Sequence, residues 1–163
     1  MSLNHPITAA VRVLRQHGVE FIPHVYPYVD RGGTAHSAQA LGVDEHSVVK
    51  TLIFEDETAR PLVVLQHGDR QVSQKAVAAA IGCKIVRPCA PELAERHSGY
   101  LVGGTSPFGM KKTLPIFVER TVLALPKIYL NGGKRGFLVA ITPRDLVRVL
   151  DAKPIDATNE PPA

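Results

Sequence analysis

The chain has 163 residues, of which 45% are hydrophobic and 21% charged, and its formal net charge is +4 with a pI of about 9.2. This length and composition are typical of one globular domain with a sizeable core. The positive charge permits a polyanionic partner, but no block of five like charges is present, so a basic tail that binds nucleic acid non-specifically is not expected. There is no signal-peptide segment or long apolar run, and Cys83 and Cys89 lack companion ligand pairs. We therefore expect a cytoplasmic protein with reduced thiols, no membrane association and no metal site.

The first half of the chain predicts a mixture of helices and strands. Periodic apolar residues predict a helix over 6–17, and a run of β-branched and aromatic residues predicts a strand over 19–26. A short helix is expected over 34–41 because a threonine precedes it and a glycine follows it. Two continuous apolar runs, 50–54 and 61–66, predict a hairpin whose strands are buried on both faces.

The second half continues this pattern without a repeat or a linker that would divide the chain. In order, it predicts a helix over 74–81, a strand over 84–87, a helix over 91–97, a strand over 115–119, a hairpin over 128–141 and a helix over 143–150. The hairpin is expected to turn at Asn131–Gly133, since consecutive glycines supply the positive φ angles of a tight turn. Three prolines after residue 151 predict a flexible tail over 152–163.

A glycine-rich stretch, residues 98–112, stands out from this pattern. It holds four of the 13 glycines, with two hydroxyl residues and a proline between them and two lysines at its exit. Bare backbone amides beside hydroxyls and cations suit a carbonyl oxygen, a phosphate or a sugar. The alternative is a connecting loop without a functional role. Loops of this length are usually functional or disordered, and the apolar run 100–102 argues against disorder. We expect a binding loop.

The familiar catalytic and cofactor motifs are missing. The chain has no dinucleotide fingerprint, Walker A loop, zinc-protease helix or nucleophile elbow, so no cofactor is expected. No nucleophile–base pair or carboxylate pair can be assigned. An enzyme of this kind would act by positioning and by backbone electrostatic stabilisation. Lys50 begins a buried strand, and taken alone it is slightly better explained as an exposed strand-end lysine.

Three segments together resemble the signatures of the YbaK family, the freestanding relatives of the editing domain of bacterial prolyl-tRNA synthetase. They are Val49–Leu52, Gly99–Pro107 and Gly132–Gly136, and the resemblance extends from about residue 6 to 151. It implies an α+β domain over residues 1–151, with a curved mixed β-sheet closed toward a barrel and helices packed outside. The implied activity is that of a trans-acting aminoacyl-tRNA deacylase that removes a mischarged small amino acid, foremost cysteine from Cys-tRNA(Pro). The implied partners are the acceptor end of mischarged tRNA, foremost tRNA(Pro), and prolyl-tRNA synthetase as a further candidate.

The resemblance also implies roles for individual residues. Lys50 would hold the terminal adenosine or its phosphate, and Gly103 would begin the loop that cradles the aminoacyl ester; these two are the catalytic candidates. The substrate-binding candidates are Tyr26, Gly104, Thr105, Ser106, Pro107, Asn131, Gly132, Gly133, Lys134 and Leu138.

Two of these positions depart from the YbaK pattern. Asn131 replaces a serine, and Leu138 replaces an aspartate that would suit the α-ammonium of the substrate. The cleaved amino acid therefore stays open between cysteine, alanine and serine, as does attack by the substrate thiol or by water. Two other classes also stay open: a noncatalytic module that binds tRNA acceptor ends or docks on a synthetase, and a small-molecule binding domain.

Overall fold

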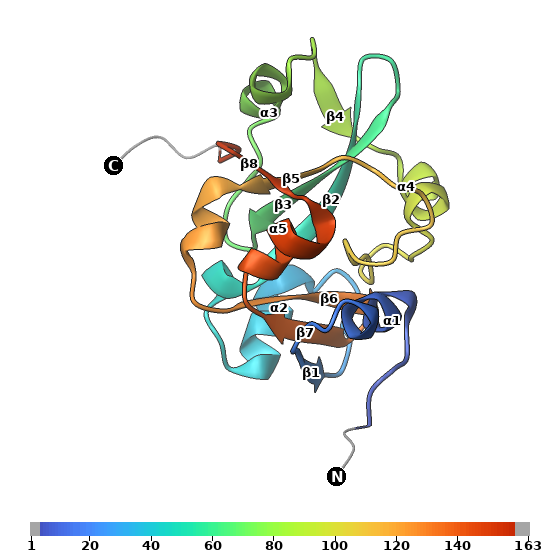
Figure 1. Ribbon diagram of the computed structural model, residues 1–163, viewed down its shortest axis with the longest axis vertical. Coiled ribbons are helices and arrows are strands. Elements are labelled where there is room, and N and C mark those ends of the chain that lie inside the picture. Colours follow the sequence, from blue (N-terminus) through green and yellow to red (C-terminus); the bar gives the residue numbers. More distant parts are fainter. Residues whose placement is uncertain (1–3, 159–163) are drawn as a thin grey trace.

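The computed structural model describes residues 4–158, which form two β-sheets and five α-helices (Figure 1). The five-stranded sheet has the order β4 (Val86–Pro88), β2 (Val49–Asp56), β3 (Pro61–His67), β5 (Ile116–Glu119) and β8 (Lys153–Ile155). The three-stranded sheet has the order β1 (Ile22–Val25), β7 (Phe137–Ile141) and β6 (Ile128–Lys134). The helices are α1 (Ala9–Gln16), α2 (Gly33–Leu41), α3 (Gln74–Ile81), α4 (Pro91–Ser98) and α5 (Arg144–Leu150). Within residues 4–158, no helix is long and apolar enough to cross a membrane.

The two sheets pack against each other across the main hydrophobic core. In β7, Phe137 and Val139 belong to this core, whereas Leu138 and Ala140 pack with Ala38 of α2 on the outer face. The five-stranded sheet follows the same rule, since alternate side chains of a strand point to opposite faces. Its outer face is covered by α3 and by the segment that follows β8 (Figure 1). Burial on both faces explains the continuous apolar runs of β2 and β3, and this prediction is confirmed.

The expected closure toward a barrel is wrong, although the α+β class, the mixed strand directions and the outer helices are confirmed. β3, β5 and β8 run parallel, while β2 pairs antiparallel with β3 and β4. The sheets remain separate and are joined by the isolated bridge between Val48 and Tyr129. Because each sheet has two apolar faces, stacking the sheets between helices buries more surface than curling one sheet around its own core.

The hairpin of β6 and β7 forms, but its turn does not lie at Asn131–Gly133. β6 continues through these residues as an irregular stretch, in which Asn131 Oδ1 accepts from the N–H groups of Gly133 (2.6 Å) and Lys134 (3.0 Å). The chain instead turns at Arg135 and Gly136, and Gly136 has a φ of +79°. An irregular strand stabilised by an asparagine and a tight turn share the same sequence signal, because both use a positive-φ glycine, here Gly133 with a φ of +100°.

The expected flexible tail is also wrong for residues 152–158, while 159–163 lie outside the described residues. β8 adds to the edge of the five-stranded sheet beside β5, and Ile155 and Ala157 are buried in the cluster under α3. Pro154 is tolerated because β8 is an edge strand. Ala157 accepts from the N–H of Ser73 at 2.7 Å, so the segment also stabilises the start of α3.

Candidate functional site

A cavity of about 790 Å³ opens between β2, the segment leading into α2, the glycine-rich loop and the hairpin of β6 and β7. Its lining includes aromatic and aliphatic side chains together with a few cations and amides. The lining residues used below are Tyr26, Tyr28, Asp30, Thr34, Lys50, Thr51, Cys89, Val102, Gly103, Thr105, Asn131, Arg135 and Leu138. A concave, largely apolar space with a few polar groups is typical of a ligand site.

Lys50 is partly buried in this cavity rather than fully exposed at a strand end. Its ammonium makes one weak contact, with the Gly68 carbonyl at 3.5 Å, and that carbonyl also accepts from Thr34 Oγ1 at 3.2 Å. Burial lowers the pKa of Lys50, and the negative charges of Glu45 and Asp69 oppose this effect. A cation with one long hydrogen bond retains donors for a ligand.

The glycine-rich loop is attached to the hairpin by its own carbonyl groups. Arg135 Nε donates to the Val102 carbonyl at 2.8 Å, and Asn131 Nδ2 donates to the Gly103 carbonyl at 3.1 Å. Gly104 lies so close to the turn that a Cβ would meet the Arg135 nitrogen at 2.8 Å. The loop is therefore a rigid wall of the cavity, as expected of a binding loop.

Two aromatic residues and Leu138 form the neighbouring wall. The guanidinium of Arg135 lies 5.4 Å from the ring centre of Tyr28, close enough for a cation–π contact. Tyr26 donates its backbone N–H to Gly136 at 2.9 Å, and burial raises the pKa of its phenol. Leu138 is 4% exposed and pairs with Asn131 across the hairpin, so the wall is apolar where a carboxylate was considered.

The cavity brings together six of the twelve residues proposed from the sequence, and the other six are not part of its lining. The lining residues are Tyr26, Lys50, Gly103, Thr105, Asn131 and Leu138, and those outside the lining are Gly104, Ser106, Pro107, Gly132, Gly133 and Lys134. Ser106 is fully buried and accepts from the Phe108 N–H at 3.2 Å, which shapes the loop. A Cβ on Gly132 would clash with the Phe137 ring, so this glycine permits core packing.

Among the lining residues that are not sequence candidates, three bear on the chemistry of the cavity: Tyr28, Thr51 and Arg135. The spacing of Tyr26 and Tyr28 was a usable signal, because alternate residues of an extended segment share a face. Thr51 is a polar residue inside an apolar strand, which was a second signal. Arg135 lies within the Gly132–Gly136 segment, but a cation in a turn is by itself weak evidence for a binding role.

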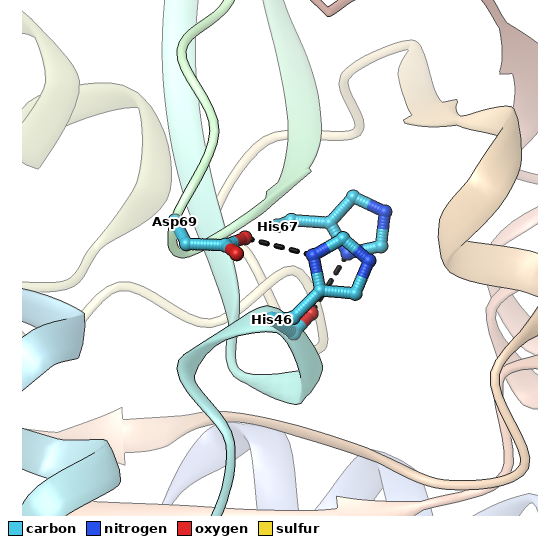
Figure 2. Close-up of side chains that lie close together, drawn as sticks. All are labelled: His46, His67 and Asp69. Carbon is cyan, nitrogen blue, oxygen red and sulfur yellow. Dashed lines mark hydrogen bonds and ion pairs between the residues drawn. The ribbon is translucent and has the colours of Figure 1, made fainter. Parts of the chain in front are cut away.

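Close to Lys50 lies a group of two histidines and an aspartate (Figure 2). His46 belongs to the short helical turn before β2, His67 ends β3, and Asp69 follows it. The rings of His46 and His67 stack with centroids 3.7 Å apart and planes 8° from parallel, and Asp69 Oδ1 lies 2.8 Å from His46 Nδ1. Both ring nitrogens of His67 are engaged, with the His46 carbonyl and with Thr121 Oγ1, each at 2.7 Å. A metal ion needs lone pairs that converge in the ring planes, and parallel rings do not provide them. As arranged, the group holds the chain that presents the Gly68 carbonyl to Lys50.

The fold is that of a small α+β domain with a cavity between a glycine-rich loop and a strand that carries a lysine. Residues 32–149 match the sequence profile of the aminoacyl-tRNA editing domain. The chain belongs to this family.

The relatives of the chain match either nearly all of it or only a part of it. The chain is 27% identical over 154 residues, 94% of each chain, to the "Putative Cys-tRNA(Pro)/Cys-tRNA(Cys) deacylase EbsC" of Enterococcus faecalis. It is 25% identical over 105 residues to the proline–tRNA ligase of Limosilactobacillus fermentum, a match to 62% of this chain and 18% of the ligase. The crystal structure of "a putative trans-editing enzyme for prolyl tRNA synthetase" has the same fold, with a TM-score of 0.82, 23% identity and coverage of 96% of this chain and all of that one.

Proposed function

We propose that this protein is a trans-acting aminoacyl-tRNA deacylase of the cytoplasm, which removes a mischarged small amino acid, foremost cysteine from Cys-tRNA(Pro). The observation that carries the proposal is that one cavity collects Lys50, the loop glycine Gly103 and Leu138 from three segments far apart in the sequence. The family and the name of the Enterococcus relative support the reaction class. The match to proline–tRNA ligases supports tRNA(Pro), with its synthetase as a further candidate partner.

Different residues of the cavity bind different parts of the substrate. The Lys50 ammonium binds the terminal adenosine or its phosphate, because it retains donors beyond its weak contact with Gly68. The Gly103 and Thr105 N–H groups donate no hydrogen bond within residues 4–158, so they are available to the oxygens of the aminoacyl ester. Tyr26 and Leu138 enclose a small side chain.

Positioning is enough for cysteine to leave the tRNA without a protein base. The cysteine thiol attacks the ester carbonyl, a sulfur–carbon bond forms as the carbon–oxygen bond to ribose breaks, and the thiol proton ends on the ribose hydroxyl. The chain contributes the conformation in which sulfur faces carbonyl carbon. With alanine or serine, a water bound at the loop is the nucleophile.

The test is multiple-turnover release of amino acid from Cys-, Ala-, Ser- and Pro-tRNA(Pro) by the wild type and by Lys50→Ala. We expect turnover of at least one mischarged tRNA, sparing of Pro-tRNA(Pro), and a fall in kcat/KM of about tenfold to a hundredfold in Lys50→Ala, because a charge-assisted contact is lost. The matched control is Lys75→Ala, on the exposed start of α3 and outside the cavity lining, which should keep full activity.

Two results would count against this proposal. Unchanged kcat/KM in a folded Lys50→Ala protein would remove Lys50 from the site. Protection of the tRNA acceptor end without turnover of any charged tRNA would favour a noncatalytic module instead.

A further inference from the structure

The edge of β2 that faces the cavity has a gap one residue long, at Thr51. β4 pairs with the far end of β2, from Phe54 to Asp56, and the Cys89 N–H extends this pairing to the Ile53 carbonyl at 3.0 Å. At the near end, Val48 forms its bridge with Tyr129 of β6. Between these two neighbours no strand covers β2 within the described residues.

The backbone of Thr51 points into this gap. The N–H and C=O groups of alternate residues in a strand face the same edge, and the Ile53 carbonyl faces Cys89, away from β3. Thr51 is two residues before Ile53, so its N–H and C=O also face away from β3. Within residues 4–158, β2 is paired at Thr51 only with Leu65 of β3, on the opposite edge, so these two groups have no strand partner although Thr51 lies in the middle of a strand.

A third polar atom of the same residue is unpaired. Thr51 Oγ1 is buried and, among the described residues, it is the one buried side-chain oxygen or nitrogen without a hydrogen-bond partner. Buried polar groups are almost always paired in folded proteins, because an unpaired one costs free energy. Three unpaired polar atoms on one residue of a cavity wall indicate a place where a ligand completes the hydrogen bonding.

We propose that the aminoacyl group binds the edge of β2 at Thr51 as a one-residue antiparallel bridge. An aminoacyl ester carries an α-ammonium donor and a carbonyl acceptor on one residue, which is the complement of the C=O and N–H of one strand residue. The Thr51 carbonyl accepts from the α-ammonium, and the Thr51 N–H donates to the ester carbonyl oxygen. This inference rests on the proposed function, and it supplies the α-ammonium partner that Leu138 cannot provide.

A carboxylate at the mouth of the cavity is the competing partner. Among the described residues that line the cavity, Asp30 is the only acidic one, and it is exposed in the segment before α2. Solvent weakens an ion pair at an exposed site, whereas Thr51 is partly buried in the cavity wall. The two partners give different results in the same assay.

The first experiment compares alanyl-tRNA(Pro) with lactyl-tRNA(Pro), in which a hydroxyl replaces the α-ammonium. We expect the wild type to prefer the alanyl ester in kcat/KM by about tenfold to a hundredfold. Thr51→Pro removes the N–H without breaking a bond to β3, and it should lower kcat/KM for both esters by a similar factor. Thr51→Val keeps both backbone groups, so it should keep the preference for the alanyl ester. If Asp30→Asn abolishes that preference, the carboxylate and not Thr51 binds the ammonium.

The second experiment needs no turnover and no variant. The wild type is mixed with 3′-deoxy-3′-(L-alanylamino)adenosine, in which a stable amide replaces the ester, and amide hydrogen exchange is measured by NMR. We expect exchange of the Thr51 N–H to slow by tenfold or more, while the Leu52 N–H, which faces β3, exchanges at an unchanged rate.

The outcomes separate this site from the proposed function. Equal turnover of alanyl and lactyl esters, or binding of the analogue without protection of Thr51, overturns the Thr51 site and leaves the deacylase standing. Protection of Thr51 without turnover of any charged tRNA overturns the deacylase and leaves the binding site standing. Neither turnover nor binding of the analogue overturns both.

Discussion

Gly103 and Gly104 are neighbours in the loop, but they accept a methyl group at different cost. A Cβ on Gly103 would meet the hydroxyl of Tyr28, a side chain that is 37% exposed and able to move. A Cβ on Gly104 would meet the backbone at Lys134 and Arg135, which cannot move without shifting the hairpin. Gly104 is thus required by the packing of the fold, whereas a methyl group at Gly103 meets a movable side chain and the strain of its φ of +89°.

We predict that Gly103→Ala lowers kcat/KM by tenfold or more. Its free energy of unfolding should fall by only about 1 kcal/mol, because of the strain of an alanine at a φ of +89°. Gly104→Ala should lower the free energy of unfolding by about 1–3 kcal/mol, because it overpacks the junction of loop and hairpin. Thermal melts and kinetics on both variants separate the two effects. Normal turnover by a folded Gly103→Ala protein would show that the loop does not approach the substrate.

The residues of the site also differ in how far the sequence could reveal them. Lys50 and Gly103 lie in motifs with fixed spacing, and both line the cavity. Arg135 lies at the cavity because the hairpin turns later than Gly132 and Gly133 indicate. Thr51 is exposed to the cavity because, within residues 4–158, no neighbouring strand covers that part of the edge of β2. A vacancy beside a strand is a property of the sheet, so no pattern within the strand itself could predict it.

At the level of elements, the segment after α5 shows how a polar network fixes a short strand. Glu119 at the end of β5 is 3% exposed and accepts from the Ala157 N–H and Thr158 Oγ1, both at 2.8 Å, and from Thr121. Burial would raise the pKa of Glu119, but these hydrogen bonds outweigh it and the pKa is lowered. The ionised carboxylate therefore holds residues 157–158 in place.

We predict that Glu119→Gln lowers the free energy of unfolding at pH 7 by about 1–3 kcal/mol, because charge-assisted hydrogen bonds become neutral ones. The folded pKa lies below the ordinary 4.5, so the unfolded state binds more protons and the wild type loses stability as the pH falls below about 4.5. The difference in the free energy of unfolding between the wild type and Glu119→Gln should become smaller in that pH range. Asp156→Asn is the control, since its side chain is 88% exposed, and its melting temperature should match the wild type. An equal loss in both variants would mean that Glu119 is not what holds the segment.

Helices that carry their own signals were predicted well, whereas strand partners were not. Ser73 caps α3 through the Ala76 N–H and Gly82 ends it with a φ of +80°, as the sequence indicated. β8 was missed because prolines usually mark a flexible end, and its place is set by β5, which lies far from it in the chain. The prediction of sheet closure failed for the same reason, because the pairing of distant strands depends on the packing of the whole fold and not on local sequence.

Across the whole molecule, the net charge of +4 bears on how a large polyanion binds. We predict that kcat/KM for charged tRNA falls by about tenfold to fortyfold between 50 and 200 mM salt if two or three phosphates are contacted. The affinity for the small alanylamino-adenosine analogue, which lacks the phosphates, should change little. Measuring both under the same buffers checks the prediction, and a parallel salt dependence would show that the charge acts at the cavity and not along the tRNA.

The pairing of β1 with β7 joins residues 22–25 to 137–140 and has a consequence for synthesis on the ribosome. Contacts between such distant residues form late, because the loop-closure entropy must be overcome first. β1 has no partner until β7 has left the ribosome, and one wall of the cavity is missing until then. A nascent chain should therefore expose Ile22 and Val25 beside an unpaired strand edge for most of its elongation.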